Sequence, residues 1–253
     1  MTGHPGFEDL EYRKRRDFIA KRVSDHCDNI LYTETENRTW QHVYEKLDVL
    51  YPEKSCSAHR SSLSFAGLSK KTIPQFSDIN LSLKAHGFKV SPVEGLIDTR
   101  EFMESLADGT MMCTRYIRHH SKPEYTPEPD IIHEVLGHCV FFHNQKYREL
   151  NISFGKAARK AADDLLEKIA RIYWYTVEFG ICTELNKPVA WGAGLLSSIE
   201  ELSRIDSIET GILDLDLIIG VEYDTTKPHE KLYKSDSTFE ETADHIIKFL
   251  SNL

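Results

Sequence analysis

A broad apolar stripe with helical spacing lies between residues 163 and 179. Its members, about one helical turn apart, are Leu166, Ile169, Ala170, Tyr173 and Val177. This period predicts a helix with one broad buried face. Glu178 lies beside the stripe, near the predicted end of the helix. Burying a carboxylate is costly unless it is paired or binds a metal, so taken alone Glu178 would be expected on the surface.

Four further segments carry helical signals. Residues 9–30 are densely charged, with apolar residues at helical spacing, and residues 75–84 follow a proline. Thr99 is a candidate cap for a helix that runs through Leu106 and is ended by Asp108-Gly109. Ser237 and Glu240 form a candidate capping box for a last helix through Phe249.

The remaining pattern predicts loops and a few short strands. Residues 87–93 alternate briefly between apolar and polar, which indicates a strand, and residues 121–129 hold three prolines, which indicates a loop. Pro129 and Asp130 are suited to begin the next helix. No repeating βαβ pattern is present. We therefore predict a mainly α fold with a few short β-strands in a single catalytic domain over residues 1–253, in which residues 1–30 form a helical extension.

Composition narrows the class of protein. The net charge of −9 argues against a nucleic-acid partner. One basic cluster, Arg13 to Arg16, lies beside acidic residues and is expected to be a solvated helix face. No apolar run reaches the roughly 20 residues that a membrane span needs, and the N-terminus lacks an apolar signal core.

The five cysteines are Cys27, Cys56, Cys113, Cys139 and Cys182. Their number is odd and their surroundings are mostly apolar. Reduced thiols in the core of a cytoplasmic protein are the simplest account.

The run His133-Glu134-Val135-Leu136-Gly137-His138 is the strongest chemical signal. Two histidines from one helix and Glu178 from another could form the 2-His-1-carboxylate triad of non-haem Fe(II) oxygenases. The histidines are five residues apart, which on an ideal α-helix separates them by about 140°. We expect Gly137 to relax the backbone at a helix end and bring the second ring back. A zinc peptidase would need histidines four apart with Glu134 as general base, and isolated histidines at this spacing would be ordinary surface residues.

The sequence on either side of this run resembles that of the pterin-dependent aromatic amino acid hydroxylases. The similarity extends from about Tyr32 to the C-terminus and rests on several long strings. These are residues 92–96, 100–102, 116–119, 121–123, 125–131, the His133–His138 run, 172–180 and 192–198.

The resemblance implies a metal centre and an amino acid site. Fe(II) would be held by His133, His138 and Glu178, with O2 as cosubstrate. In that family the arginine matching Arg118 holds the substrate carboxylate through its planar fork of donors, and the aspartate matching Asp130 holds the arginine. An ordinary surface salt bridge is the alternative for this pair. The residues that match positions shaping the substrate pocket are Thr126, Pro129, Trp174, Gly194 and Ser197.

The resemblance also implies a site for tetrahydrobiopterin or a related tetrahydropterin. Phe102 matches the phenylalanine that stacks on the pterin ring, and Tyr173 matches a tyrosine close to the iron. The other residues expected at the pterin are Gly95, Leu96, Ile97, Thr99 and Glu134. Animal members usually carry a histidine where this chain has Met112, which can pack on a ring but cannot hydrogen-bond in the same way.

The preferred expectation is hydroxylation of L-phenylalanine to L-tyrosine, because Trp174 matches phenylalanine and tyrosine hydroxylases. Tryptophan or tyrosine as substrate and hydroxylation at the meta carbon remain open, as do a zinc-dependent hydrolase and a metal-binding protein without turnover. We expect a stand-alone catalytic domain with no regulatory domain or tetramerisation tail, which is a cytoplasmic monomer or weak dimer without nucleic-acid or membrane partners.

Overall fold

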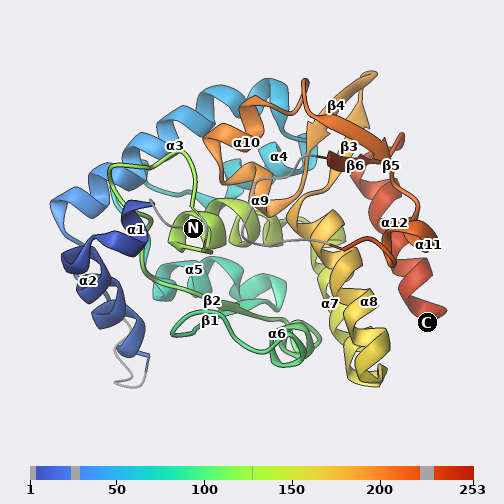
Figure 1. The fold of residues 1–253 in the computed structure, drawn as a ribbon, viewed down its shortest axis with the longest axis horizontal. Coiled ribbons are helices and arrows are strands. Elements are labelled where there is room, and N and C mark those ends of the chain that lie inside the picture. Colours follow the sequence, from blue (N-terminus) through green and yellow to red (C-terminus); the bar gives the residue numbers. More distant parts are fainter. Residues whose placement is uncertain (1–3, 24–28, 127, 223–230) are drawn as a thin grey trace.

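The computed structural model describes residues 4–23, 29–126, 128–222 and 231–253. Over these residues the protein is mainly helical, as predicted, with two small sheets (Figure 1). The helices are α1 Pro5–Glu8, α2 Leu10–Lys21, α3 Glu34–Lys54, α4 Ser57–Ala66, α5 Phe76–Leu83, α6 Thr99–Leu106, α7 Gln145–Lys160, α8 Asp163–Tyr173, α9 Ala193–Leu196, α10 Ile199–Ser203, α11 Leu215–Ile218 and α12 Phe239–Ser251. Two short 3-10 helices are η1 Lys84–His86 and η3 Phe141–His143, and two π-helical segments are η2 His133–Cys139 and η4 Trp174–Glu178.

The strands form two separate sheets. Strands β1 Lys89–Pro92 and β2 Thr110–Cys113 pair in parallel across α6 and so form a βαβ unit. Strands β3 Ile181–Glu184, β4 Lys187–Ala190, β5 Glu209–Ile212 and β6 Lys231–Lys234 form a second sheet in the order β4-β3-β6-β5. The predicted strand over residues 87–93 is confirmed as β1, whereas β2 was not predicted.

Several predicted helix boundaries hold and two caps are wrong by one residue. Helix α5 matches the predicted helix over 75–84, and the 121–129 segment is a loop over its described residues. Helix α6 is capped by Asp98 instead of Thr99, because the Asp98 carboxylate accepts from the backbone N–H groups of the first turn. The capping box of α12 is Thr238 with Glu241, one residue after the predicted pair.

The N-terminal helix is shorter and less solvated than predicted. Helix α2 ends at Lys21, and residues 24–28 of the predicted segment lie outside the described residues. Arg15 donates to Glu36 at 2.8 Å, and Arg16 donates to Glu128 at 2.6 Å while it stacks over the ring of Tyr116. Arg15 and Arg16 therefore attach α2 to segments that are distant in sequence, so the basic cluster does not face only solvent.

One continuous hydrophobic core joins helices α3 to α12, and a small second cluster around Ile19 and Tyr116 attaches α2. Segment η2, yellow-green at the centre of Figure 1, lies inside the main core, where Val135 and Leu136 are fully buried. Gly137 packs against α9, and a Cβ atom at this position would lie 2.8 Å from the Ala193 carbonyl oxygen. The core therefore encloses the segment that carries the two candidate ligand histidines.

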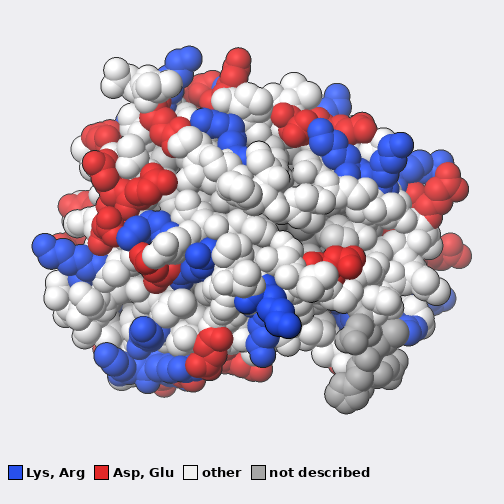
Figure 2. All heavy atoms as spheres, turned by 180° about the vertical axis from the view of Figure 1, so that it is seen from behind, with Lys and Arg blue, Asp and Glu red and all other residues white. Residues whose placement is uncertain are grey.

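Both signs of charge occur on the surface, and the described cysteines lie in the interior. Figure 2 shows acidic and basic residues interspersed on that face of the molecule. Among the described residues, no helix combines the length and apolar character that crossing a membrane requires. Cys56, Cys113, Cys139 and Cys182 are free and buried, as predicted, whereas Cys27 lies outside the described residues.

Candidate metal and substrate site

The two histidines of η2 face each other because the helix is a π-helix. Its hydrogen bonds join residues five apart, as in the 3.0 Å bond from the Val140 N–H to the Val135 carbonyl. The Nε2 atoms of His133 and His138 are 3.2 Å apart. The expectation that Gly137 relaxes a helix end is wrong, since η2 continues through it. The wider turn aligns the rings, and Gly137 allows the close approach of α9.

Glu178 reaches the same point from a second π-helical segment. Segment η4 continues α8, and the Glu178 carboxylate lies 3.4 Å from His133 Nε2 and 3.2 Å from His138 Nε2. Ligands about 2.1 Å from one ion at right angles to each other are roughly 3 Å apart. The three side chains therefore fit a divalent cation on one face and leave the opposite face open to other ligands.

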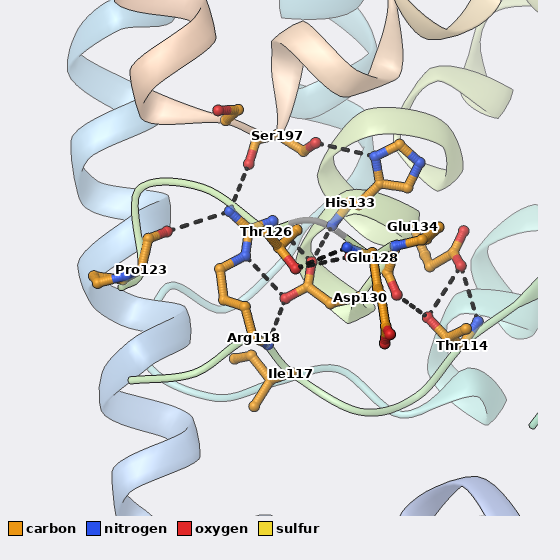
Figure 3. Close-up of polar contacts among 12 residues, drawn as sticks. Thr114, Ile117, Arg118, Pro123, Thr126, Glu128, Asp130, His133, Glu134 and Ser197 are labelled. Carbon is orange, nitrogen blue, oxygen red and sulfur yellow. Dashed lines mark hydrogen bonds and ion pairs between the residues drawn. The ribbon is translucent and has the colours of Figure 1, made fainter. Parts of the chain in front are cut away.

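Glu134 is a second carboxylate near these histidines. Its ligand atom lies within 4.8 Å of theirs, so it too could belong to a metal cluster. However, Glu134 Oε1 accepts hydrogen bonds from the backbone N–H and the hydroxyl of Thr114, at 2.9 and 3.1 Å (Figure 3). Burial raises the pKa of Glu134 to about 7. Glu178 contacts both imidazole nitrogens directly and is therefore the stronger candidate for the third ligand.

Each candidate ligand histidine is oriented through its other ring nitrogen. His133 Nδ1 lies 3.2 Å from the Ser197 hydroxyl, which itself donates to the Ala193 carbonyl, so the hydroxyl accepts from the ring. His138 Nδ1 lies 2.9 Å from the hydroxyl of Tyr147. With Nδ1 protonated, each Nε2 presents a lone pair to a shared metal position.

Burial and charge act differently on the three groups. Burial lowers the pKa of His133 to about 4, so this ring is neutral at pH 7. Burial also opposes charge on His138, but the Glu178 carboxylate outweighs it and raises the pKa of His138. The same contacts with the histidines overcome burial and lower the pKa of Glu178. A bound cation would take the place of the proton in this pair.

Arg118 is held in a buried network next to the metal position (Figure 3). Its Nε and Nη2 donate to the two carboxylate oxygens of Asp130 at 2.9 and 2.8 Å. Its Nη1 donates to the Ser197 carbonyl at 3.0 Å and to the Pro123 carbonyl at 3.2 Å. The bidentate fork therefore clamps Asp130, and among the described residues one of the five N–H groups has no partner.

Asp130 also sets the position of η2. Its Oδ1 accepts from the His133 backbone N–H at 3.1 Å, so it caps a helix that begins at Ile131. The predicted helix start is thus displaced by one residue, with Asp130 as the cap. One aspartate links the arginine to the histidine segment.

A cavity of about 420 Å³ brings the predicted site residues together. Every site residue predicted from the sequence lines it except Asp130, which lies behind Arg118. These lining residues are Gly95, Leu96, Ile97, Thr99, Phe102, Arg118, Thr126, Pro129, His133, Glu134, His138, Tyr173, Trp174, Glu178, Gly194 and Ser197. Its size is typical of a site for small molecules.

Aromatic rings form much of the cavity wall. Phe102 meets Tyr173 edge to face with centroids 5.7 Å apart, and Trp174 packs on Phe179 with centroids 4.7 Å apart. Met112 also lines the cavity. Such a wall suits flat, apolar ligands with few polar groups.

The sequence analysis missed several lining residues, including Ser198 and Glu201. Ser198 is the last residue of the 192–198 string, and Glu201 lies just beyond it. A serine followed three residues later by a glutamate is typical of a capping box, so this spacing by itself does not indicate a position at a cavity.

The chain matches the family described as biopterin-dependent aromatic amino acid hydroxylase over residues 1–253. It is 39% identical over 246 residues to the phenylalanine-4-hydroxylase of Caenorhabditis elegans, which covers 92% of this chain and 54% of that protein. It is 36% identical over 261 residues to human tyrosine 3-monooxygenase, which covers 99% of this chain and 49% of that protein. The chain therefore spans about half the length of these curated relatives.

The fold is also similar to that of a Chromobacterium violaceum phenylalanine hydroxylase with bound iron(III) and the oxidised cofactor 7,8-dihydrobiopterin. The TM-score is 0.79 and the identity 28%, with 94% of this chain and 86% of that chain covered.

Proposed function

Since this chain belongs to the biopterin-dependent aromatic amino acid hydroxylase family, we propose that it hydroxylates the ring of an aromatic amino acid. The proposed reaction uses Fe(II), a tetrahydropterin and O2, with L-phenylalanine converted to L-tyrosine as the preferred case. The observation that carries this proposal is the convergence of His133, His138 and Glu178 at one wall of a cavity that Arg118 also lines.

The metal ligands of the proposal are His133, His138 and Glu178. When bound, iron and a tetrahydropterin supply the reductive activation of O2. The protein holds its two rings in one tautomer through Ser197 and Tyr147 and places the Glu178 carboxylate beside both of them. This arrangement keeps the donor atoms aimed at one point before the cation arrives.

The pterin would lie along the wall formed by Gly95, Leu96, Ile97 and Thr99, with Phe102 against its ring. Glu134, held by Thr114, presents a carboxyl group with a pKa near pH 7 toward this region of the cavity. Such a group can hold or release a proton at physiological pH. Met112 makes this wall more apolar than a histidine would, so we expect its effect to be on pterin affinity.

The amino acid would enter with its carboxylate toward Arg118 and its ring toward the metal position. Asp130 holds the guanidinium in place, and Thr126, Pro129 and Gly194 shape the remaining wall. Trp174 and Ser197 complete this side. A cavity lined in this way excludes water and positions the ring, which is the main contribution a protein makes when a cofactor carries the chemistry.

Tyrosine is the second candidate substrate, because a tyrosine 3-monooxygenase is 36% identical over nearly the whole chain. Trp174 supports a single-ring substrate over tryptophan, since its indole occupies part of the cavity wall.

One assay tests the proposed function. The purified protein is incubated with Fe(II), a tetrahydropterin and each aromatic amino acid in turn, and products are identified by mass and retention. We expect iron-dependent and pterin-dependent tyrosine from phenylalanine. A zinc-loaded sample serves as control and is expected to be inactive. Product formation that requires zinc but neither iron nor pterin would replace the hydroxylase by a hydrolase.

A further inference from the structure

Glu201 is a buried carboxylate without a partner at the edge of the cavity. It lies on α10 and is 3% exposed, and it lines the same cavity as Arg118 and Ser197. Neither of its side-chain oxygens has a hydrogen-bond partner among the described residues. A desolvated carboxylate in this state is costly, so a partner outside the protein chain is the natural way to satisfy it.

The local structure does not explain why an acid is present there. Ser198 caps α10 by accepting from the Glu201 backbone N–H at 3.2 Å. In the complete capping boxes of α3 and α12, the glutamates Glu36 and Glu241 also return their side chains to the backbone of the cap residue. The Glu201 side chain makes no such bond, so its carboxylate is free for another role.

The electrostatic surroundings favour a cation. Burial raises the pKa of Glu201, and the charge of Arg204 opposes this shift only in part. No hydrogen bond from Arg204 reaches either oxygen. A positively charged ligand group beside the Glu201 carboxylate would therefore stabilise its negative charge.

The position of Glu201 relative to Arg118 identifies that group. Arg118 donates to the Ser197 carbonyl at 3.0 Å, and the next residue, Ser198, begins the short helix that carries Glu201. Arg118 and Glu201 therefore both line the cavity, and the five residues from Ser197 to Glu201 connect the carbonyl that Arg118 contacts to the acid. An α-amino acid carries its carboxylate and its ammonium group on one carbon and needs opposite charges at such close quarters.

We propose that Glu201 binds the α-ammonium group of the amino acid substrate, opposite Arg118 at the carboxylate. This rests on the proposed function, because it takes an aromatic amino acid as the substrate. It adds a specific requirement for the amino group, so that an aromatic acid without nitrogen would fit the cavity and bind weakly.

The test compares two ligands that differ only in the amino group. L-phenylalanine and 3-phenylpropanoate are titrated by calorimetry into the iron-loaded enzyme under nitrogen, without pterin, so that no turnover occurs. Glu201→Gln keeps the shape of the side chain and removes its charge. We expect it to weaken L-phenylalanine binding by about 10- to 100-fold and to change 3-phenylpropanoate binding by less than about 3-fold.

The matched control is Glu200→Gln, which neutralises an exposed carboxylate on the same helix and is expected to bind both ligands as wild type does. Glu201→Asp keeps the charge on a shorter side chain and is expected to retain part of the preference for L-phenylalanine. Removing an unpaired buried charge does not weaken the fold, so the melting temperature of Glu201→Gln without ligand is expected to equal or exceed that of wild type.

Two results would overturn the inference. Equal loss of both ligands in Glu201→Gln would assign the residue a structural role, and unchanged binding of L-phenylalanine would remove it from the site. Failure of the proposed function is distinguishable, because wild type would then neither bind nor hydroxylate any aromatic amino acid. If wild type hydroxylates phenylalanine while Glu201→Gln binds it normally, only the ammonium site is wrong.

Discussion

Two neighbouring parts of the cavity differ in how their charges are satisfied. We call the part lined by His133, His138 and Glu178 the metal end, and the part lined by Arg118 and Glu201, where we propose that the substrate binds, the amino acid end. At the metal end, His133, His138 and Glu178 contact one another at 3.2 to 3.4 Å. At the amino acid end, Arg118 is fixed by Asp130 and two carbonyls, whereas neither carboxylate oxygen of Glu201 has a hydrogen-bond partner among the described residues. The donor atoms of the first end therefore converge on one point, and the second end combines a fixed cation with an anion that lacks such a partner.

This difference predicts how each end responds to change. The donor atoms at the metal end converge on one point and contribute little to the apolar core. Removing one of them is therefore expected to affect metal binding more than folding. Arg118 uses most of its donors within the protein, so few remain for a substrate. A change at Arg118 is therefore expected to alter substrate affinity before it alters metal binding. The predictions below test this division, from the largest expected effect to the smallest.

The largest effect is expected from removing a metal ligand. His133→Ala, His138→Ala and Glu178→Ala should each strip the iron or abolish hydroxylation, because a coordination bond is lost. The helical content should remain, since the surrounding core is apolar and intact. Iron content by mass spectrometry, product formation and circular dichroism measure the three outcomes.

Glu167→Ala is the matched control for Glu178→Ala. Glu167 lies on α8, the helix that continues into η4, and its side chain is 73% exposed. This variant should keep iron and activity. Normal iron and activity in any of the three ligand variants would show that the residue is not a ligand, and retention in Glu178→Ala alone would move the third position to Glu134.

The next effect concerns the fixed cation of the amino acid end. Arg118→Lys keeps the charge but loses the fork that clamps Asp130, so we expect KM for the amino acid to rise roughly 10- to 150-fold. Iron content should stay normal, because Arg118 is not a ligand. Steady-state kinetics check this, with Arg38→Lys at an exposed position as control. An unchanged KM would exclude Arg118 from the amino acid end.

The sequence identified the members of the site better than their geometry. Every predicted site residue except Asp130 lines one cavity. These residues could be predicted because long strings of the sequence are similar to a known family. The alignment of His133 with His138 was beyond prediction from the α-helical period, since a π-helix depends on packing around the segment. The roles of these residues in binding are predictions that the kinetic experiments test.

Long-range partners account for part of what the sequence analysis missed. The Arg16 contact with Glu128 joins residues 112 positions apart, and the pairing of β1 with β2 depends on the crossover through α6. Helix α6 is capped by Asp98 and not by the predicted Thr99. Both residue types can cap a helix, so the local sequence does not distinguish between two adjacent candidates. Glu201 was missed because it lies beyond the 192–198 string and no local pattern assigns it to a cavity.

A smaller effect is expected from a buried histidine beneath the metal end. His59 Nε2 lies 3.0 Å from the Leu136 carbonyl of η2, and the ring packs between Tyr51 and Phe141. Burial lowers the pKa of His59 from 6.5 to about 4. The folded-state pKa lies below that of the unfolded chain. His59 therefore contributes stability above pH 6.5 that is lost as the pH falls toward 4.

This linkage corresponds to about 2 kcal/mol of unfolding free energy lost between pH 7 and pH 5. His59→Phe removes the titrating group, so its unfolding free energy should fall less over this range than that of wild type. Urea unfolding at the two pH values measures the difference. His245→Gln, at an exposed position of α12, should keep the wild-type dependence. Parallel pH dependence in wild type and His59→Phe would exclude His59 as a source of the linkage.

The smallest effect is expected where the two ends meet, at the ring wall. Trp174 lines the cavity and packs on Phe179, so its indole occupies space that a bicyclic substrate would need. Trp174→Phe enlarges that space, and an apolar pocket discriminates by only about 1–3 kcal/mol for such a change. The ratio of kcat/KM for tryptophan to that for phenylalanine should therefore rise by about 10-fold, with iron content unchanged. If the ratio stayed flat, or if wild type already preferred tryptophan, Trp174 would not set specificity and the choice of phenylalanine would lose its main support.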